Sequence, residues 1–383
     1  MERYLKMRLQ TSIEQITADV DKHKLLISSN CPLAVLSSAV HNGGFKTANK
    51  IISIHVPEIN DDNCNRKMDD LDKELHENPE IILKKALIRL NIDPDTSIGI
   101  MTHADVQNVE VSCQKHNEVT LSAFVTGGVE VASTAGELTI SNPNHLKIDP
   151  IGTINVILLV DGNLTESCMV DAIKTIIEAK TVALRELDIR SYFSGDQASG
   201  TVTDSVVVAC TKRGKPMKYA GTATVFGELV GKSVKEALKK TLYKEQHIVP
   251  DRPLIKRLKE RKICFEKMLS LFVEAHPGLA KNSERFNKEV LQILSNPKII
   301  PFVIACFRLD DDLKIGLIPD YLIDKAIVVE VFQNAVINCI FSNNNSKQIK
   351  IEDANSISVA NMGPFVGGIL AAIMSCIYIN MHN

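Results

Sequence analysis

The pattern of apolar and polar positions is clearest in the middle of the chain, between residues 152 and 204. An apolar run at residues 153–160 predicts a buried strand, and a polar turn follows it. Residues 166–188 then repeat apolar side chains at helical spacing, with Thr165 placed as the N-cap, so we expect a long amphipathic helix there. A second apolar run at residues 205–210 predicts another buried strand. The pattern thus predicts a strand–helix–strand unit at the centre of the first domain.

Shorter patterns of the same kind flank this unit. Apolar runs and alternation predict strands at residues 24–28, 33–37, 51–56, 97–101, 106–113 and 118–126. Amphipathic spacing predicts helices at residues 79–90 and 224–243. Residues 58–77 and 135–146 are polar and have little periodicity, so we expect loops there.

The pattern changes at Pro250 and Pro253, which bracket a charged linker. Beyond it, helical spacing dominates, at residues 255–273, 284–294, 299–307, 321–341 and 366–379. A chain of 383 residues exceeds what one hydrophobic core usually supports, so we expect two domains, residues 1–249 and 250–383. The predicted fold class is an α/β or α+β layered sheet-and-helix domain followed by a small all-α domain.

Composition and charge narrow the classes of function. The formal net charge of −2 provides no basic footprint, so nucleic acid is not an expected partner. The nine cysteines occur singly, without a C-x-x-C pair, which favours small buried thiols in a reducing compartment over zinc or disulfide sites. The charged N-terminus is not followed by the apolar stretch of a signal peptide. We therefore expect a cytoplasmic protein.

One uncharged segment is a candidate for membrane association. Residues 363–381 carry no charge and nearly reach the length that crosses a bilayer. The segment is single and is interrupted by Pro364, Gly367 and Gly368. We favour a buried core helix, and membrane contact through this segment is the alternative.

Two irregularities mark candidate chemistry in the first domain. Lys180 falls in the middle of the apolar face of the helix at residues 166–188. Its stem either follows the core to the rim, or its ammonium pairs with a carboxylate such as Asp204 and polarises a bound carbonyl or phosphate. Asp204 ends a hydroxyl-rich turn, Ser199-Gly200-Thr201-Val202-Thr203-Asp204, although such a turn is also ordinary at a strand entry.

Two glycine pairs add a second kind of candidate. Gly43-Gly44 and Gly127-Gly128 each follow a predicted strand and put flexible backbone at its end. Backbone N–H groups there could approach a ligand or hold an oxyanion, and two tight turns are the plain alternative.

The order of these motifs along the chain resembles the adenosylcobinamide amidohydrolase family. The matching segments are Ser37-Ser38-Ala39-Val40-His41-Asn42-Gly43-Gly44, Thr126-Gly127-Gly128, Gly152-Thr153-Ile154-Asn155, Glu178-Ala179-Lys180, Gly200-Thr201-Val202-Thr203-Asp204, Tyr219-Ala220-Gly221-Thr222-Ala223-Thr224 and Gly227-Glu228-Leu229-Val230-Gly231. They lie within residues 24–243. One position departs from the pattern, since a histidine is expected where this chain has Ala223.

The resemblance implies cleavage of the amide that joins the aminopropanol arm to the corrin ring of adenosylcobinamide, giving adenosylcobyric acid in corrinoid salvage, chiefly in archaea. Asp204 or Glu178 would activate water and Lys180 would stabilise charge, with a hydroxyl of Thr201 or Thr203 as the alternative nucleophile. No cofactor is expected for this domain. The residues implied to contact the substrate are Ser38, Asn42, Gly43, Gly44, Thr126, Gly127, Gly128, Asn155, Gly200 and Thr222.

In the second domain, carboxylates precede and enter a mostly apolar helix. The helix predicted at residues 321–341 would carry Asp320, Asp324, Asn334 and Asn338 on one side, and the run Asp310-Asp311-Asp312 lies upstream. Asp310, Asp311, Asp320 and Asp324 are candidate Mg²⁺ ligands, and Asp320 and Asp324 are also candidate catalytic groups. A solvated aspartate loop with asparagines that bridge helices is the alternative.

The motifs Gly316-Leu317-Ile318-Pro319-Asp320, Leu322-Ile323-Asp324-Lys325-Ala326 and Gly363-Pro364-Phe365 resemble the α-ribazole phosphatase family, which is related to phosphatidylglycerophosphatase A. This resemblance implies removal of the phosphate of α-ribazole 5′-phosphate. The leading hypothesis is therefore a bifunctional corrinoid-salvage hydrolase. One alternative keeps the amidohydrolase and makes the helical domain an oligomerisation or membrane-docking module. Another is a non-enzymatic corrinoid carrier, motivated by Ala223.

Overall fold

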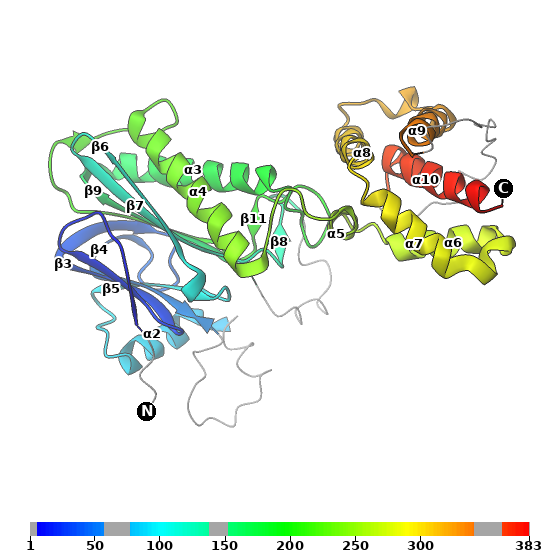
Figure 1. Cartoon of the computed structure of the whole chain (residues 1–383). Coiled ribbons are helices and arrows are strands. Elements are labelled where there is room, and N and C mark those ends of the chain that lie inside the picture. The colour runs from blue at the N-terminus through cyan, green and yellow to red at the C-terminus, as the bar shows by residue number, and fades with distance from the viewer. Residues whose placement is uncertain (1–5, 57–76, 138–151, 341–361, 383) are drawn as a thin grey trace. The chain divides into compact units, whose positions relative to one another are not determined.

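The computed structural model describes residues 6–56, 77–137, 152–340 and 362–382. The chain divides into two compact units, Met1–Phe193 with Gln197–Pro250, and Ser194–Asp196 with Asp251–Asn383. The first is a mixed sheet with helices and the second is helical (Figure 1). The predicted fold class is confirmed. The loops expected at residues 58–77 and 135–146 lie largely outside the described residues.

A nine-stranded mixed sheet forms the first unit in the described residues. Its order is β1-β2-β3-β12-β9-β7-β6, with β4 beside β3 and β5 beside β4. The strands are β1 Met7–Leu9, β2 Ile16–Val20, β3 Lys24–Ser37, β4 Gly44–His55, β5 Ser97–Thr102, β6 Glu110–His116, β7 Val119–Gly127, β9 Ile154–Asp161 and β12 Ser205–Cys210. The central strands β9 and β12 are parallel, whereas β3 and β7 run antiparallel to them.

Three strand predictions need correction. The two strands expected at residues 24–28 and 33–37 are one strand, β3, whose register against β4 shifts between Ser28 and Leu33. Residues 30–32, between the two apolar halves, are exposed. A bulge here interrupts the alternation of buried and exposed side chains but does not end the strand, so the sequence pattern resembled two strands. The strand expected at residues 106–113 begins instead as a 3-10 turn, and β6 starts only at Glu110.

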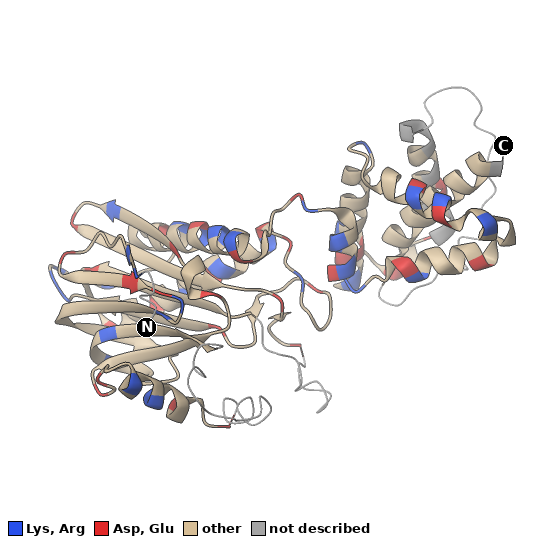
Figure 2. Cartoon of the chain, turned by 60° about the horizontal axis from the view of Figure 1, so that its bottom comes forward, with Lys and Arg blue, Asp and Glu red and all other residues tan. Residues whose placement is uncertain are grey.

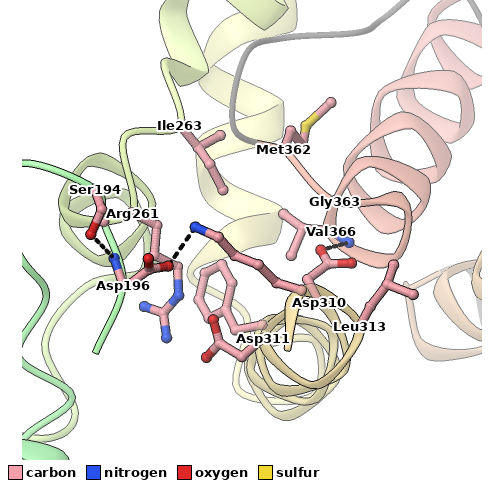
Figure 3. A pocket seen from close by; sticks show the side chains of 13 residues that line it. Ser194, Asp196, Arg261, Ile263, Asp310, Asp311, Leu313, Met362, Gly363 and Val366 are labelled. Atoms are coloured by element: carbon pink, nitrogen blue, oxygen red, sulfur yellow. Dashed lines mark hydrogen bonds and ion pairs between the residues drawn. The ribbon is translucent and has the colours of Figure 1, made fainter. Parts of the chain in front are cut away.

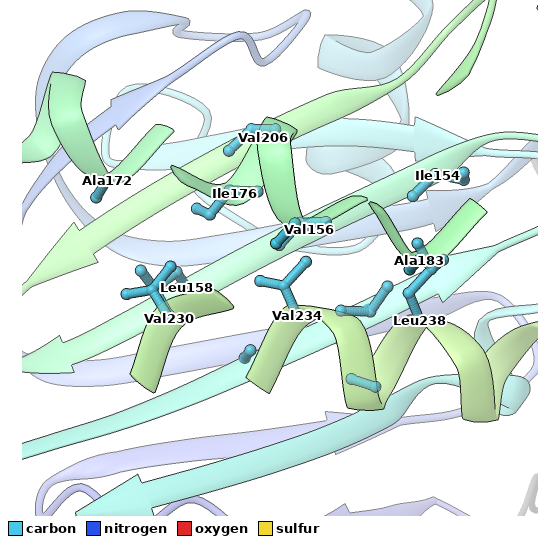
Figure 4. Packing of buried hydrophobic residues seen from close by; sticks show 14 of the residues in the cluster. Ile154, Val156, Leu158, Ala172, Ile176, Ala183, Val206, Val230, Val234 and Leu238 are labelled. Carbon is cyan, nitrogen blue, oxygen red and sulfur yellow. The ribbon is translucent and has the colours of Figure 1, made fainter. Parts of the chain in front are cut away.

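Helices α3 (Glu166–Glu186) and α4 (Val225–Gln246) cover one face of the sheet (Figure 1). The predicted cap of α3 is confirmed, since the Thr165 hydroxyl accepts a hydrogen bond from the Cys168 amide at 3.2 Å. Figure 4 shows the packing of Ala172, Ile176 and Ala183 of α3 and Val230, Val234 and Leu238 of α4 against Ile154, Val156, Leu158 and Val206 of the sheet. We call this side of the sheet the helix face.

The opposite side, which we call the open face, has its own apolar cluster. It includes Val35 of β3, Phe124 of β7, Ile157 of β9 and Val207 of β12, together with residues of β2, β4 and β5. Successive side chains of a strand point to opposite faces, so in β9 and β12 the members of this cluster alternate with residues packed under α3 and α4. The short helix α2 (Pro79–Arg89), predicted at residues 79–90, packs on β4 and β5 with a separate small cluster.

The second unit consists of helices α5 (Leu254–Glu260), α6 (Phe265–Ala275), α7 (Ser283–Leu294), α8 (Ile300–Lys314), α9 (Lys325–Ile340) and α10 (Pro364–His382). The single helix expected at residues 255–273 is two helices. The helix expected at residues 299–307 continues to Lys314, so the aspartate run is helical and not a loop. In the described residues of both units, Lys and Arg are interspersed with Asp and Glu (Figure 2).

Helix α10 contains the uncharged segment considered for membrane contact. Its residues 364–381 are long and apolar enough to cross a bilayer by length and composition, and 56% of that window is buried inside the protein. Ile369, Leu370 and Ile373 are among its fully packed residues in the core of this unit. A core helix passes the same test of length and composition, so this observation is weak support for a membrane span.

Candidate functional site

Several sequence motifs of the first unit meet at one edge of the sheet. Strands β3 and β7 end there, and β9 and β12 begin there. Thr126 of β7 and Ser205 of β12 are both register partners of Asn155 in β9, and Ser37 at the end of β3 pairs with Val207. Segments that are distant in the sequence therefore bring Ser38, Thr126, Asn155 and Asp204 to a common edge.

Lys180 and Asp204 form a buried ion pair on the helix face of this edge. The Lys180 Nζ lies 2.5 Å from Asp204 Oδ2, and the two side chains are 7% and 11% exposed. The Lys180 side chain therefore does not extend along the core to place its ammonium group in solvent. Of the two alternatives weighed from the sequence, the carboxylate pair with Asp204 is the one that forms. Because two buried charges lose their hydration, each requires the other and further hydrogen bonds.

Asp204 receives those further hydrogen bonds from two neighbouring segments. Its Oδ1 accepts from the Ile154 amide at 3.0 Å and from the Thr201 hydroxyl, and its Oδ2 also accepts from the Thr201 amide at 3.1 Å. With Lys180, four donors surround the carboxylate, which matches the number of lone-pair positions that it offers. Asp204 thereby joins α3, the start of β9 and the turn that carries Thr201.

Gly200 allows this arrangement. A Cβ atom at this position would lie 2.5 Å from Asp204 Oδ2 and 2.7 Å from Lys180 Nζ. Both distances are shorter than real Cβ contacts, so any larger residue would displace the ion pair. The glycine of the predicted motif is therefore explained by its close approach to the two charged groups.

Other motif residues connect the ends of neighbouring strands by hydrogen bonds. The Asn155 side chain donates to the Met101 carbonyl at 2.8 Å and accepts from the Ser205 amide at 3.2 Å. The exposed Ser38 accepts from the Val206 amide at 3.0 Å through its hydroxyl. Thr203, also exposed, places its hydroxyl 2.6 Å from that of Thr153.

The two glycine pairs occupy close-packed turns. A Cβ at Gly43 would lie 2.4 Å from the Ala39 carbonyl oxygen, and Gly44 has a φ of +81°. Asn42 stabilises this turn by donating to the carbonyls of Pro94 and Ser97, each at 2.8 Å. This turn reaches strand β5, through the bridge between His41 and Gly99.

The second pair contacts helix α4 and the start of β9. A Cβ at Gly127 would meet Leu238 of α4 at 3.2 Å, and the Gly128 amide donates to the Thr153 carbonyl at 3.2 Å. The sequence suggested that the Gly128 amide could hold an oxyanion. In the structure this amide is instead bonded to the Thr153 carbonyl. These glycines serve close packing at the edge.

Two predicted site residues lie away from the ion pair. Glu178 is exposed, and its place two residues before Lys180 puts it on the far side of α3. Thr222 is exposed in the turn before α4, where the Ala220 amide bonds to Asp171 of α3 at 2.8 Å. Asp171 precedes Lys180 by nine residues, or about 13 Å along the helix axis. The structure does not bring Glu178 or Thr222 to Asp204.

The end of α4 contributes residues that sequence reasoning missed. The Gln246 side chain accepts from the Val129 amide at 2.9 Å, next to Gly128. Glu245 accepts from the Asp105 amide at 3.0 Å and from the Asn108 side chain at 2.6 Å. These contacts join positions more than a hundred residues apart, so no local pattern indicates them.

In the second unit, Asp310 caps a helix. Its carboxylate accepts from the amides of Phe365 and Val366 at 3.0 and 2.9 Å, at the start of α10. Burial raises the pKa of the Asp310 carboxyl to about 6, although the two amides act in the opposite direction. Asp310 also lines a cavity of about 290 Å³ with Asp311 and Arg261 (Figure 3). Lys314 lines the same cavity, and its Nζ lies 2.5 Å from the Asp196 carboxylate.

The four carboxylates predicted to hold Mg²⁺ do not form a common cluster. Asp320 lies in a 3-10 turn and α9 begins at Lys325, so the predicted helical side with Asp320, Asp324 and Asn334 does not exist. The Asp324 carboxylate instead accepts from the Ile327 amide at 3.4 Å. Within the described ranges no group of three or more His, Cys, Asp or Glu side chains is placed to hold a metal ion.

The described cysteines are free, and not all of them are buried. Cys168, Cys210, Cys306 and Cys376 are buried, and burial raises the pKa of the Cys168 thiol to about 11. Cys31 and Cys264 are exposed, so the expectation of small buried thiols is wrong for these two.

Comparison with known proteins identifies similar sequences in archaea. The uncharacterized protein MJ1613 of Methanocaldococcus jannaschii is 32% identical over 178 residues, which is 43% of this chain and 69% of that protein. The adenosylcobinamide amidohydrolases of Methanosarcina mazei and Halobacterium salinarum are each 31% identical, over 37% and 33% of this chain. The matches span 64% and 54% of those two proteins, so less than two thirds of each is covered.

The family model for adenosylcobinamide amidohydrolase matches residues 7–250, which include the sheet, helices α3 and α4, and the edge that holds Lys180 and Asp204. The second unit lies outside this match. On the extent of the match, the chain belongs to the adenosylcobinamide amidohydrolase family.

Proposed function

We propose that the first unit hydrolyses the amide between the aminopropanol arm and the corrin ring of adenosylcobinamide. The proposal is supported by membership of the family and by the names of two archaeal relatives. The products are adenosylcobyric acid and the free amine. Amide hydrolysis needs a nucleophile, a group that receives its proton and a positive or hydrogen-bonding group that stabilises the charged intermediate.

The observation that carries the proposal is the contact series Thr201–Asp204–Lys180. The Thr201 hydroxyl donates to Asp204, whose other oxygen is paired with Lys180 at 2.5 Å. A hydroxyl bonded to a base that a third group orients is the usual arrangement of an activated nucleophile. Thr203 lacks this arrangement, because its hydroxyl meets only that of Thr153 among the described contacts.

In the proposed reaction, Thr201 Oγ1 attacks the amide carbonyl carbon while its proton passes to Asp204. The C–N bond breaks as the amine takes up a proton, and water then hydrolyses the threonyl ester to the acid. Lys180 stabilises negative charge during both steps. Glu178 has no part in this scheme, because its exposed side chain is on the other side of α3.

The test compares two threonines of the same turn. Thr201→Val lowers the rate of adenosylcobyric acid formation at least about 100-fold, because the hydroxyl is lost, whereas Thr201→Ser keeps most of it. Thr203→Val is the matched control, with an expected change below about 3-fold for a neutral hydrogen bond. Chromatographic detection of the corrinoid acid gives the rates. Unchanged turnover in Thr201→Val, or its loss in Thr203→Val, contradicts the assignment.

For the second unit we propose removal of the phosphate of α-ribazole 5′-phosphate. The cavity lined by Asp310, Asp311, Arg261 and Lys314 supports this, since it combines carboxylates with cationic side chains that suit a phosphate. Phosphate release from α-ribazole 5′-phosphate by the full chain, with and without Mg²⁺, is the measurement. Asp311→Asn should reduce the rate at least about 10-fold if this carboxylate takes part.

Absence of phosphate release under both conditions favours the other roles of the helical unit, oligomerisation or membrane docking. Light scattering and vesicle flotation distinguish these two. A chain that binds adenosylcobinamide without cleaving it would instead be a corrinoid carrier, consistent with alanine at position 223.

A further inference from the structure

Two cationic side chains that line the cavity of the second unit differ in how firmly they are held. The Arg261 guanidinium lies 4.0 Å from the centre of the Phe307 ring, and Arg261 is only 8% exposed, so it is fixed against the cavity wall. Lys314 is the last residue of α8, and its side chain is 59% exposed. Because a lysine carries its charge on a flexible four-carbon stem, Lys314 can change its partner more easily than Arg261 can.

The partner of Lys314 is Asp196, in the short segment Ser194–Asp196 of the same unit. The Lys314 Nζ lies 2.5 Å from the Asp196 carboxylate (Figure 3). The backbone of this segment is held in two ways. The Asp196 amide donates to the Ser194 hydroxyl at 3.2 Å, and Gly195 lies so close to Arg261 that a Cβ atom would be 2.9 Å from its carbonyl oxygen. Asp196 is therefore fixed beside the cavity, whereas the stem of Lys314 is not.

The ion pair between Lys314 and Asp196 is weak enough to exchange. The Asp196 side chain is 39% exposed, so water screens both charges, and exposed pairs of this kind contribute little to stability. A phosphate monoester carries close to two negative charges at neutral pH and has three strong acceptor oxygens. It therefore binds an ammonium group more strongly than one exposed carboxylate does.

The other charges of the cavity wall do not favour an anion by themselves. The wall contains three carboxylates, those of Asp196, Asp310 and Asp311, but only two cations, Arg261 and Lys314. Asp310 is bonded to two amides at the start of α10. A phosphate that enters the cavity therefore gains most where a cation can leave its carboxylate, and Lys314 is placed to do so.

We propose that Lys314 moves from Asp196 to a phosphate group bound in the cavity, with Arg261 as the fixed anion-binding residue. Asp196 then competes with the phosphate for Lys314 and lowers its affinity, which favours release of inorganic phosphate after the reaction. This inference rests on the proposed removal of phosphate in the same cavity, and it adds a residue, Asp196, that sets affinity through another side chain.

The test uses two substitutions that should change binding in opposite directions. Inorganic phosphate is titrated calorimetrically into the full chain at neutral pH. Asp196→Asn should strengthen binding about 3- to 10-fold, because Lys314 loses its competing partner and a nearby negative charge is removed. Lys314→Met should weaken binding about 10-fold or more, because a charge-assisted hydrogen bond is lost.

A double variant separates exchange of the lysine from simple repulsion. When Lys314→Met is already present, Asp196→Asn should strengthen binding by only about 2-fold or less, since only the screened repulsion between carboxylate and phosphate is relieved. An equal gain with and without the lysine means that Asp196 merely repels phosphate, and overturns the inference.

Glu289→Gln is the matched control. Glu289 pairs with Arg285 on α7 at 3.0 Å, and the two side chains are 32% and 70% exposed. Neither lines the cavity. Loss of this exposed carboxylate should leave phosphate binding unchanged, and its melting temperature shows what the loss of one exposed ion pair does to stability.

Unchanged or weaker binding in Asp196→Asn overturns the inference, as does wild-type binding in Lys314→Met or a wild-type chain that binds no phosphate. The proposed function is judged separately, by release of phosphate from α-ribazole 5′-phosphate. Release by the wild-type chain with insensitive Asp196 and Lys314 variants refutes the inference alone. Opposite shifts in phosphate binding without any release retain the anion site and refute the phosphatase.

Discussion

Lys180→Met lowers the free energy of unfolding of the first unit by about 3 kcal/mol and removes most of the amide-cleaving turnover. Lys180 is only 7% exposed, and its loss leaves the Asp204 carboxylate buried without its counter-charge. Three neutral donors, from Ile154 and Thr201, still surround Asp204, which keeps the expected loss at the lower end of the range for a broken buried pair. Urea denaturation and the adenosylcobinamide assay measure the two effects.

Two further variants separate stability from chemistry. Lys174→Met, on the same helix, removes a partner of Asp171 that is 57% exposed, so the change should stay below about 0.5 kcal/mol. Combining Lys180→Met with Asp204→Asn removes both charges, so we expect recovery of much of the stability but not of the turnover. A stable, inactive double variant supports a role in the reaction, and recovery of turnover contradicts it.

Gly200→Ala is the second change with a large expected effect. Its Cβ would lie 2.5 Å from Asp204 Oδ2 and 2.7 Å from Lys180 Nζ. The Asp204 carboxylate is held by the Ile154 amide and cannot withdraw without losing that bond. We expect a loss of about 1–3 kcal/mol in stability and a fall in turnover of about 100-fold, because reacting groups displaced by about 1 Å lose catalytic efficiency.

Gly231→Ala provides the matched control for that substitution. Gly231 is inside α4, and its Cβ would meet nothing closer than the Ala179 Cβ at 4.0 Å. Alanine there should stabilise the helix by about 0.5–1 kcal/mol and leave turnover unchanged. If Gly200→Ala behaves like Gly231→Ala, then the ion pair tolerates displacement and the account of Gly200 is wrong.

In the first unit, helices could be predicted from the sequence more accurately than strands. Thr165 caps α3 as predicted. The prediction used the threonine itself and the apolar spacing that follows it, and both signals are local in the sequence. Strand β4 begins at Gly44, seven residues before its predicted start, because its first residues are mostly exposed and show no alternation. Strand pairing depends on distant partners, so hydropathy alone underestimates the extent of such strands.

The same distinction applies to the candidate site. A lysine in the apolar stripe of α3 is a local anomaly, and it correctly indicated a partner for Lys180. The four donors around Asp204 come from three segments, so only the fold brings them together. The predicted side shared by Asp320 and Asp324 does not exist, because the prediction assumed a helix that starts four residues early, within the 3-10 turn Asp320–Leu322.

The last turn of α4 has a consequence for separating the two units by protein engineering. The motifs that carry the family resemblance lie within residues 24–243, so a truncation at Tyr243 would keep all of them. It would, however, delete Glu245 and Gln246, which accept hydrogen bonds from Asp105 and Val129. The loops that contain Asp105 and Val129 would then lose these hydrogen bonds to the end of α4. A minimal amidohydrolase must therefore extend to Pro250, the limit of the compact unit.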